Sequence, residues 1–521
     1  MTTTGSRQIA RAAGVVMAGF VLSNLVGLVR QILITRAFGT SAEIDAFYVA
    51  EKIPSLVLAL VAGGALASAF IPTFTGFLEK GERPEAWRLA SAILNLMSLL
   101  LAGLSVVGYF LAPQLVGGLL APDFPAEQQA LTVELLRILL LTMLLFGASG
   151  LLMGILNAHQ LFLLPALAPT MYWLGMIFGV AFLAPTMGVH GLAWGAVLGA
   201  GLHLAVQLPG LRRLPERRYW PSLGLQVAAV RDVGRLMGPR LLGVAAVQVN
   251  FLVNVIIASS LPEGSLTALT IAFQIMTMPQ VVIAQGIAIA ALPTFSAQVA
   301  RGELGEMRSS LASTLRGILF LAIPATVGLM LLREPAVSML FQRGEFDARS
   351  VSLTAWALLW YTAGLVGHSL VEILSRAFYA LQDTKTPVLV GTTAMALNVV
   401  FSLWFAQLFS EAGYAPHGGL ALANSAATGL ETILLMALMR KRLGGLNGRA
   451  VMTGTVQASL AAVGMGAGLW LWIRITEGQG AWVVTLAGIA LGGLAYLAAM
   501  AVMRVPEVFE LRDAVMRRLR A

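Results

Sequence analysis

Residues 23–82 of this 521-residue chain read SNLVGLVRQILITRAFGTSAEIDAFYVAEKIPSLVLALVAGGALASAFIPTFTGFLEKGE, and this stretch decides the fold. It holds two apolar runs long enough to cross a membrane, joined by a short polar corner. Arg30 interrupts the first run, and Asp45 and Lys52 lie at the head of the second. An Arg near mid-bilayer costs about 2.5–3.5 kcal/mol on insertion scales, so it normally faces a polar cavity or a partner.

The second run is also broken, by Pro54, by the pair Gly63 and Gly64, and by Pro72. Interrupted membrane helices are tolerated where the freed backbone lines a cavity or packs on protein. A charge inside one run and breaks inside the next together predict one wall of a transporter cavity.

The composition is that of a polytopic membrane protein. Hydrophobic residues make up 58% of the chain, charged residues 11%, and the mean hydropathy is +0.82. Soluble domains carry roughly 25% charged residues. The chain has no cysteine, and its five histidines show no metal-ligand spacing, which excludes a disulfide scaffold and a thiolate metal site. We therefore expect no metal and no bound cofactor.

The net charge of +9 predicts contact with anionic membrane lipids and not with nucleic acid, because basic residues beside membrane helices face the anionic cytoplasmic leaflet. Enzyme signatures such as a phosphate-cradling Gly-rich loop with its Lys, or a nucleophile elbow, are missing from the sequence. We expect a secondary transporter and not an enzyme. A sodium gradient, a proton gradient or the membrane potential would drive it.

Apolar windows of roughly 20 residues predict fourteen membrane spans. They cover residues 12–35, 46–77, 88–112, 130–156, 162–185, 188–208, 238–260, 266–296, 310–332, 352–380, 387–409, 418–439, 452–474 and 481–503. Lys and Arg gather in the turns that follow even-numbered spans. By the positive-inside rule, both termini are expected in the cytoplasm.

The chain also repeats itself. PTFTGFLEKGE at 72–82 matches PTFSAQVARGE at 293–303 with an offset of 221 residues, and the matches of Gln160 with Gln382 and of Pro165 with Pro387 share an offset of 222. Six spans separate the two halves. An even number gives both halves the same orientation, so they form a parallel pair related about the membrane normal, with substrate bound between them.

The expected fold is all-α, with two parallel-repeat six-helix lobes and two extra C-terminal helices. The predicted segments are an N-terminal lobe at 1–209, a cytoplasmic linker at 210–237, a C-terminal lobe at 238–440, the last two spans at 441–504 and an amphipathic cytoplasmic tail at 505–521. The last two spans are rich in small residues, which suit either close helix packing or a lipid-facing groove.

Arg30 is the strongest functional candidate, because a fixed cation in a cavity suits an anionic phosphate or carboxylate. The alternatives are a structural ion pair with Asp45 or Glu51, or snorkelling to the outer interface. Asp45 and Lys52 either form a gate pair or mark the outer end of the second span.

Glu372 and Arg376 are separated by one helical turn, which suits either an internal ion pair or a proton or substrate relay. Asn24, Gln274 and Asn398 are polar without charge, and interhelical hydrogen bonding is their default role.

Several blocks resemble the bacterial MurJ (MviN) family of lipid II flippases, in the multidrug/oligosaccharidyl-lipid/polysaccharide exporter superfamily. They are VGLVRQILITRAFGTSAEIDAFYVAEKIP, AFIPTF, LFQRGEF, SRAFYALQDTKTPV and HGGLALANS, in this order along most of the chain. The resemblance implies fourteen helices in the bacterial cytoplasmic membrane, with spans thirteen and fourteen forming a groove for a polyprenyl tail. It also implies export of undecaprenyl-linked peptidoglycan precursor (lipid II) to the outer leaflet by alternating access, for cell-wall biogenesis and cell shape, alongside cell-wall synthesis proteins.

The resemblance also identifies site residues. Arg30, Asp45 and Lys52 match the family pattern for substrate binding or gating, and Ser55 stands where an Asn is common. Arginines of the family cluster are replaced by three other residues: Asn24, Leu58 and Gln274. Asn398 resembles a position of the family's sodium site, while Ser402 replaces an acid nearby.

Two other functions stay open. With one cation in place of several, this chain could move a different lipid-linked oligosaccharide. A cation-coupled multidrug exporter of the same superfamily would favour an acidic cavity, whereas the cavity helices here keep Arg30.

Overall fold

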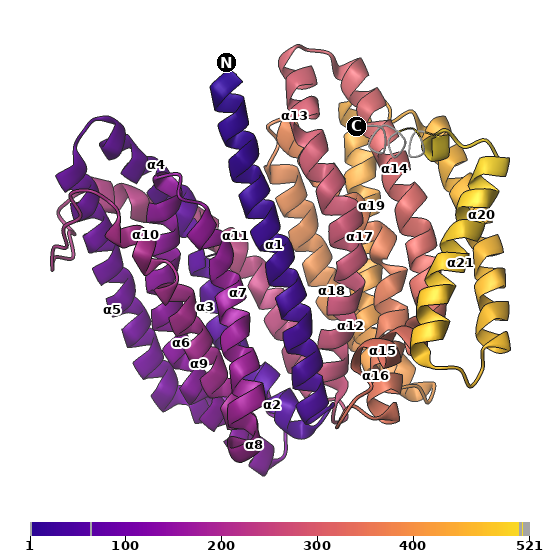
Figure 1. The fold of residues 1–521 in the computed structure, drawn as a ribbon, viewed down its shortest axis with the longest axis horizontal. Helices are drawn as coiled ribbons and strands as arrows, with labels where there is room; N and C mark the ends of the chain where they lie inside the picture. The colour runs from indigo at the N-terminus through magenta and orange to yellow at the C-terminus, as the bar shows by residue number, and fades with distance from the viewer. Residues whose placement is uncertain (1–2, 63–64, 510–512, 514–521) are drawn as a thin grey trace. The chain divides into compact units, whose positions relative to one another are not determined.

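The computed structural model describes residues 3–62, 65–509 and 513 of the chain, without the side chains of 3–13, 15, 58, 60–62, 65–68 and 239–247. Every regular element in these ranges is helical (Figure 1). The chain forms two compact units, one of Met1–Glu263 with Arg343–Phe346 and one of Gly264–Gln342 with Asp347–Ala521. Gly63, Gly64 and the side chain of Leu58 lie outside the described residues, as does most of the predicted tail.

The first unit contains eleven α-helices among its described residues. They are α1 (Thr3–Phe38), α2 (Ala42–Ala50), α3 (Lys52–Ala62), α4 (Ala65–Glu79), α5 (Arg83–Leu115), α6 (Ala126–Ala158), α7 (Leu163–Phe178), α8 (Ala184–Met187), α9 (Val189–Ala205), α10 (Leu208–Arg212) and α11 (Ala228–Ser259). Short π-helical turns extend α5 over Val116–Leu120 and α7 over Gly179–Leu183. α11 packs against α3 and α4, within this unit.

The second unit contains the remaining helices of the described chain. They are α12 (Ser265–Gln280), α13 (Gly286–Ala300), α14 (Leu304–Leu331), α15 (Arg333–Phe341), α16 (Ala348–Ala363), α17 (Leu365–Ala380), α18 (Lys385–Glu411), α19 (His417–Arg442), α20 (Gly448–Ile475) and α21 (Ala481–Val502). A π-helical turn at Val281–Gln285 joins α12 to α13. The yellow pair α20 and α21 pack together, and α20 packs along α14 (Figure 1).

The described residues contain eleven helices that are long and apolar enough to cross a membrane, or twelve when α16 and α17 count as one span. These two helices are bent by 44° at Gly364, where a Cβ would lie 2.6 Å from the Ser425 hydroxyl of α19. The other two predicted spans coincide with α2–α4, where the sequence breaks occur, and with α11. The all-α membrane fold is confirmed, and the count of fourteen is compatible with these helices.

The repeat found in the sequence recurs in the backbone. Gln160 and Gln382, one after α6 and one after α17, both adopt a left-handed conformation with φ of 59°. Gly81 and Gly302 are a second matched pair, with φ of 76° and 74°. Left-handed conformations are uncommon for a residue with a side chain such as Gln, so their recurrence at the offsets of the sequence repeat indicates that the matched helices of the two halves end in the same turns.

Helices α7 and α9 approach each other closely enough to bring their backbones into contact. A Cβ on Gly175 would lie 2.2 Å from the Cα of Gly199, and a Cβ on Gly179 would lie 2.6 Å from the Cα of Gly195. Glycine permits this approach because it has no Cβ. The contact fixes α7 in place, and α7 also packs along α1, the helix that carries Arg30.

Candidate functional site

Arg30 lies on α1 and turns its guanidinium group toward α7. The guanidinium carbon is 4.2 Å from the centre of the Trp173 ring, a cation–π contact. Nη2 donates to Oε1 of Gln31 at 3.0 Å, and Nη1 lies 3.8 Å from the sulfur of Met176. Nε is buried and has no hydrogen-bond partner among the described residues. The cation is therefore held by an aromatic face and an amide, both of them uncharged.

Three further polar side chains, Tyr48, Tyr172 and Glu51, lie around Arg30 and its partners. Gln31, which accepts from Arg30, donates through Nε2 to the Tyr48 hydroxyl of α2 at 2.8 Å. Tyr172, next to Trp173 on α7, donates to Oε1 of Glu51 at 3.4 Å. We call this set, from α1, α2 and α7 and from the residue between α2 and α3, the Arg30 cluster. Its residues are Arg30, Gln31, Tyr48, Glu51, Tyr172 and Trp173.

The geometry distinguishes among the roles predicted for Arg30. A guanidinium group stacked on an aromatic ring gains about 0.5–2 kcal/mol, depending on how far it is desolvated. A carboxylate would have neutralised the charge, and in the described residues neither Asp45 nor Glu51 is within ion-pair distance of Arg30. Trp173 leaves the guanidinium charge unpaired, and the one carboxylate of the cluster, Glu51, is held by Tyr172, so Arg30 itself suits an anionic ligand.

The other predicted residues of the first unit lie on α1, α2 and α3. Asn24 is exposed, and its Nδ2 donates to the carbonyl of Phe20 in its own helix at 2.8 Å. Lys52 is partly buried at the start of α3, and the Ser55 hydroxyl donates to its carbonyl at 3.0 Å. Asp45 is 3% exposed on α2. Among the described residues, the cluster reaches α2 through Tyr48. Ligand contacts by Asn24, Asp45, Lys52 and Ser55 stay a prediction.

The predicted residues of the second unit lie on three of its helices. Arg376 and Glu372 form an ion pair along α17, with side chains 22% and 24% exposed, and the same Nη1 donates to the Glu372 carbonyl at 3.1 Å. Gln274 is partly buried on α12, and its carbonyl accepts from the Thr277 hydroxyl. Asn398 is 3% exposed on α18. The geometry of Glu372 and Arg376 is that of an internal pair; a relay role stays a prediction.

Trp173 and Tyr172 belong to the cluster but are missing from the residues chosen from sequence. Aromatic residues near span ends are interpreted as interfacial anchors, yet these two lie in the middle of α7. The sequence signal that could have identified them is an aromatic pair in the middle of a span, away from the interface. Pairing it with Arg30 requires knowledge of which helices pack together.

A model of the family described as "Lipid II flippase MurJ" matches residues 34–491 of the chain. The curated lipid II flippase MurJ of Burkholderia cenocepacia is 33% identical over 434 residues, covering 82% of this chain and 83% of the relative. The probable lipid II flippase MurJ of Bdellovibrio bacteriovorus is 31% identical over 509 residues, covering 94% and 95%.

Solved structures share the fold. A lipid II flippase MurJ in an inward closed conformation matches with a TM-score of 0.80 and 23% identity, covering 96% of this chain and 99% of that one. An inward-facing multidrug resistance transporter of the MATE family matches with a TM-score of 0.67 and 17% identity, covering 82% and 96%. At these identities the likeness concerns the arrangement of helices alone.

Proposed function

The chain belongs to the lipid II flippase MurJ family, and we propose that it carries the undecaprenyl-linked peptidoglycan precursor across the cytoplasmic membrane by alternating access. The substrate is a lipid-linked anion, whose pyrophosphate would contact Arg30. Aromatic residues around the cation exclude water and strengthen that contact.

The observation that carries this proposal is the stacking of Arg30 on Trp173 at 4.2 Å. The guanidinium group keeps its charge, and Trp173 fixes its plane. A planar, fixed guanidinium group can bind two oxygens of a phosphate at once, which an ammonium group cannot do. In the second unit, Glu372 and Arg376 are paired with each other, so the proposal does not rest on them.

Complementation tests the proposed function. The wild-type chain, expressed in a bacterium depleted of its own flippase, is expected to restore growth and rod shape. A second measurement follows the arrival of lipid II in the outer leaflet by labelling it on intact cells. A chain that reaches the membrane and rescues neither growth nor lipid II export would refute the proposal and favour a different lipid-linked oligosaccharide as substrate.

Coupling to a sodium gradient, a proton gradient or the membrane potential is part of the proposal, with Asn398 as a candidate ion ligand. Export of the kind proposed needs an energy source, because the substrate is moved in one direction. Lipid II export measured after collapse of each gradient in turn would identify the source.

Both termini are proposed to lie in the cytoplasm, since basic residues gather at one end of the helices. Because the chain is cysteine-free, single cysteines report their own side of the membrane. Ser410→Cys at the end of α18 is expected to react with an impermeant maleimide on intact cells. Lys441→Cys at the end of α19 is expected to react only after permeabilisation. Both positions are exposed. The reverse pattern, or labelling of both on intact cells, would contradict the orientation.

A further inference from the structure

A groove opens in the second unit where α14, α17, α19 and α20 come together. Its volume is about 940 Å³, and it is lined by the N-terminal part of α14, Leu370 of α17, the last turns of α19, the first turns of α20 and the loop between α19 and α20. No described residue of α21 lines it. It is therefore separate from any space between the two C-terminal helices, and it belongs to the second unit, whereas the Arg30 cluster belongs to the first.

Three arginines line the groove: Arg308, Arg440 and Arg449. Arg308 points Nη1 at the carbonyl of Gly444, at 3.5 Å, and its buried Nε has no hydrogen-bond partner in the described chain. None of the three forms an ion pair with a described carboxylate. The groove thus concentrates positive charge that the described protein leaves uncompensated.

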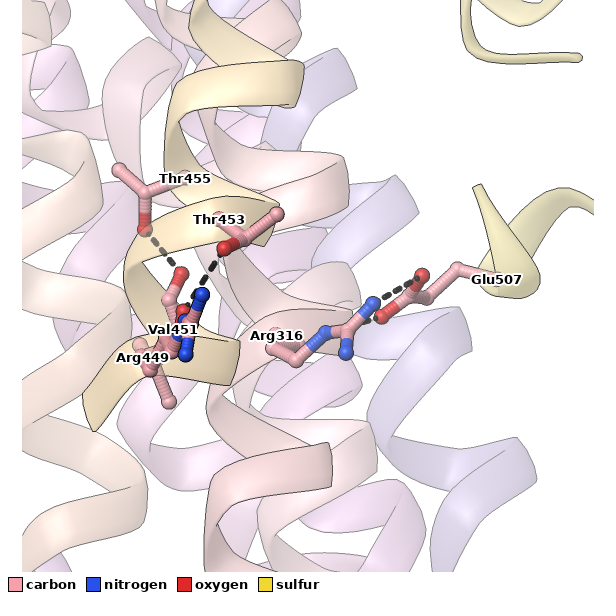
Figure 2. A network of polar contacts seen from close by, with 6 residues as sticks. All are labelled: Arg316, Arg449, Val451, Thr453, Thr455 and Glu507. Carbon is pink, nitrogen blue, oxygen red and sulfur yellow. Dashed lines mark hydrogen bonds and ion pairs between the residues drawn. The ribbon is translucent and has the colours of Figure 1, made fainter. Parts of the chain in front are cut away.

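Two neighbouring arginines, unlike the three in the groove, are paired with carboxylates. Arg316, two turns beyond Arg308 on α14, binds Glu507 through two contacts, Nε to Oε1 at 2.7 Å and Nη2 to Oε2 at 3.0 Å (Figure 2). Arg442, two residues after Arg440, pairs with Asp383 at 2.9 Å. Since adjacent arginines on the same helices have carboxylate partners, the three groove arginines stand out as a set open to an external anion.

The rest of the groove wall is apolar. Leu315, Leu319, Leu370, Met436 and Met452 line it. Thr455, also on the wall, donates its hydroxyl to the carbonyl of Val451 in its own helix, as Figure 2 shows. Its hydrogen-bonding capacity as a donor is therefore used. A groove with arginines and a hydrocarbon wall matches a molecule with an anionic head and an aliphatic chain.

We propose that this groove binds an anionic phospholipid of the surrounding membrane, with the phosphodiester on Arg308, Arg440 and Arg449 and an acyl chain along the apolar wall. The arginines lie within about two turns of the ends of their helices, the level at which headgroups meet membrane helices. A soluble anion would leave the apolar wall unused. The inference does not depend on the identity of the transported substrate.

The test is lipid binding to the purified, delipidated protein by native mass spectrometry. Wild type is titrated with phosphatidylglycerol and with phosphatidylcholine that carries the same acyl chains. We expect tighter binding of phosphatidylglycerol, and Arg440→Ala and Arg449→Ala are each expected to weaken it roughly tenfold to a hundredfold, the usual loss for one charge-assisted contact. Both side chains are exposed, so neither variant opens a cavity in the core.

Arg442→Ala is the matched control, because it removes the same charge from the same helix end but from a residue already paired with Asp383. It should keep the preference for phosphatidylglycerol. Equal loss in Arg440→Ala and Arg442→Ala, or no preference in wild type, would overturn the proposal in favour of general surface charge. Displacement of the phospholipid by equimolar undecaprenyl pyrophosphate would overturn it in favour of a substrate site, and displacement by equimolar inorganic phosphate in favour of a simple anion site.

Discussion

Arg30→Ala is expected to abolish complementation of a flippase-depleted bacterium at matched membrane levels. The side chain supplies the one cation of its cluster and forms no ion pair with a described carboxylate, since Glu51 of the same cluster is bound by Tyr172. Losing a charge-assisted contact costs about 1.5–3 kcal/mol, which corresponds to a tenfold to more than hundredfold weaker binding of the anionic head. Arg30→Lys keeps the charge but loses the planar fork, so its rescue and its lipid II export should be intermediate.

Arg137 of α6 provides a matched control for this prediction. Its guanidinium carbon lies 4.6 Å from the centre of the Tyr109 ring, and its Nε donates to the Tyr109 carbonyl. It is thus another arginine stacked on an aromatic ring in the same unit, outside the Arg30 cluster. Arg137→Ala should leave growth and lipid II export near wild-type levels. Full rescue by Arg30→Ala would remove Arg30 from the mechanism, while equal failure of both variants would point to a structural role for stacked arginines.

Arg30 could be predicted as a site residue from the sequence, because a cation inside a membrane span is costly in lipid and therefore needs a polar cavity or a partner. Its surroundings were not predictable in the same way. The residue that holds it, Trp173, is 143 positions away in sequence and lies on another helix, α7. Which face of α7 meets α1 depends on tertiary packing, and no local pattern encodes it.

The fold was predictable to a similar degree. Hydropathy located the long helices, because each must satisfy its backbone polar groups internally over a membrane-length run. It did not predict the bend at Gly364, which depends on the close approach of α19. The repeat was detected from side chains alone, and the matched left-handed conformations of Gln160 and Gln382 show that it extends to the turns.

The second large effect is expected from Gly199→Ala on α9. The new Cβ would lie 2.4 Å from the carbonyl oxygen of Tyr172 and 3.0 Å from its ring, closer than real Cβ atoms come to a backbone atom. The two helices must separate, and overpacking of this kind costs about 1–3 kcal/mol of stability. Since Tyr172 and Trp173 are the α7 part of the Arg30 cluster, both the thermal midpoint of the purified protein and complementation should fall.

Gly201→Ala on the same helix is the control, because nothing lies within 4 Å of its Cβ position. In a helix interior, exchanging Gly for Ala without a clash gains up to about 1 kcal/mol by restricting the unfolded chain. The two substitutions should therefore shift the thermal midpoint in opposite directions although they differ by two residues. Equal midpoints for the two variants would mean that α7 and α9 do not meet through their backbones. A lower midpoint for Gly199→Ala with undiminished rescue would mean that the position of α7 does not govern the Arg30 cluster.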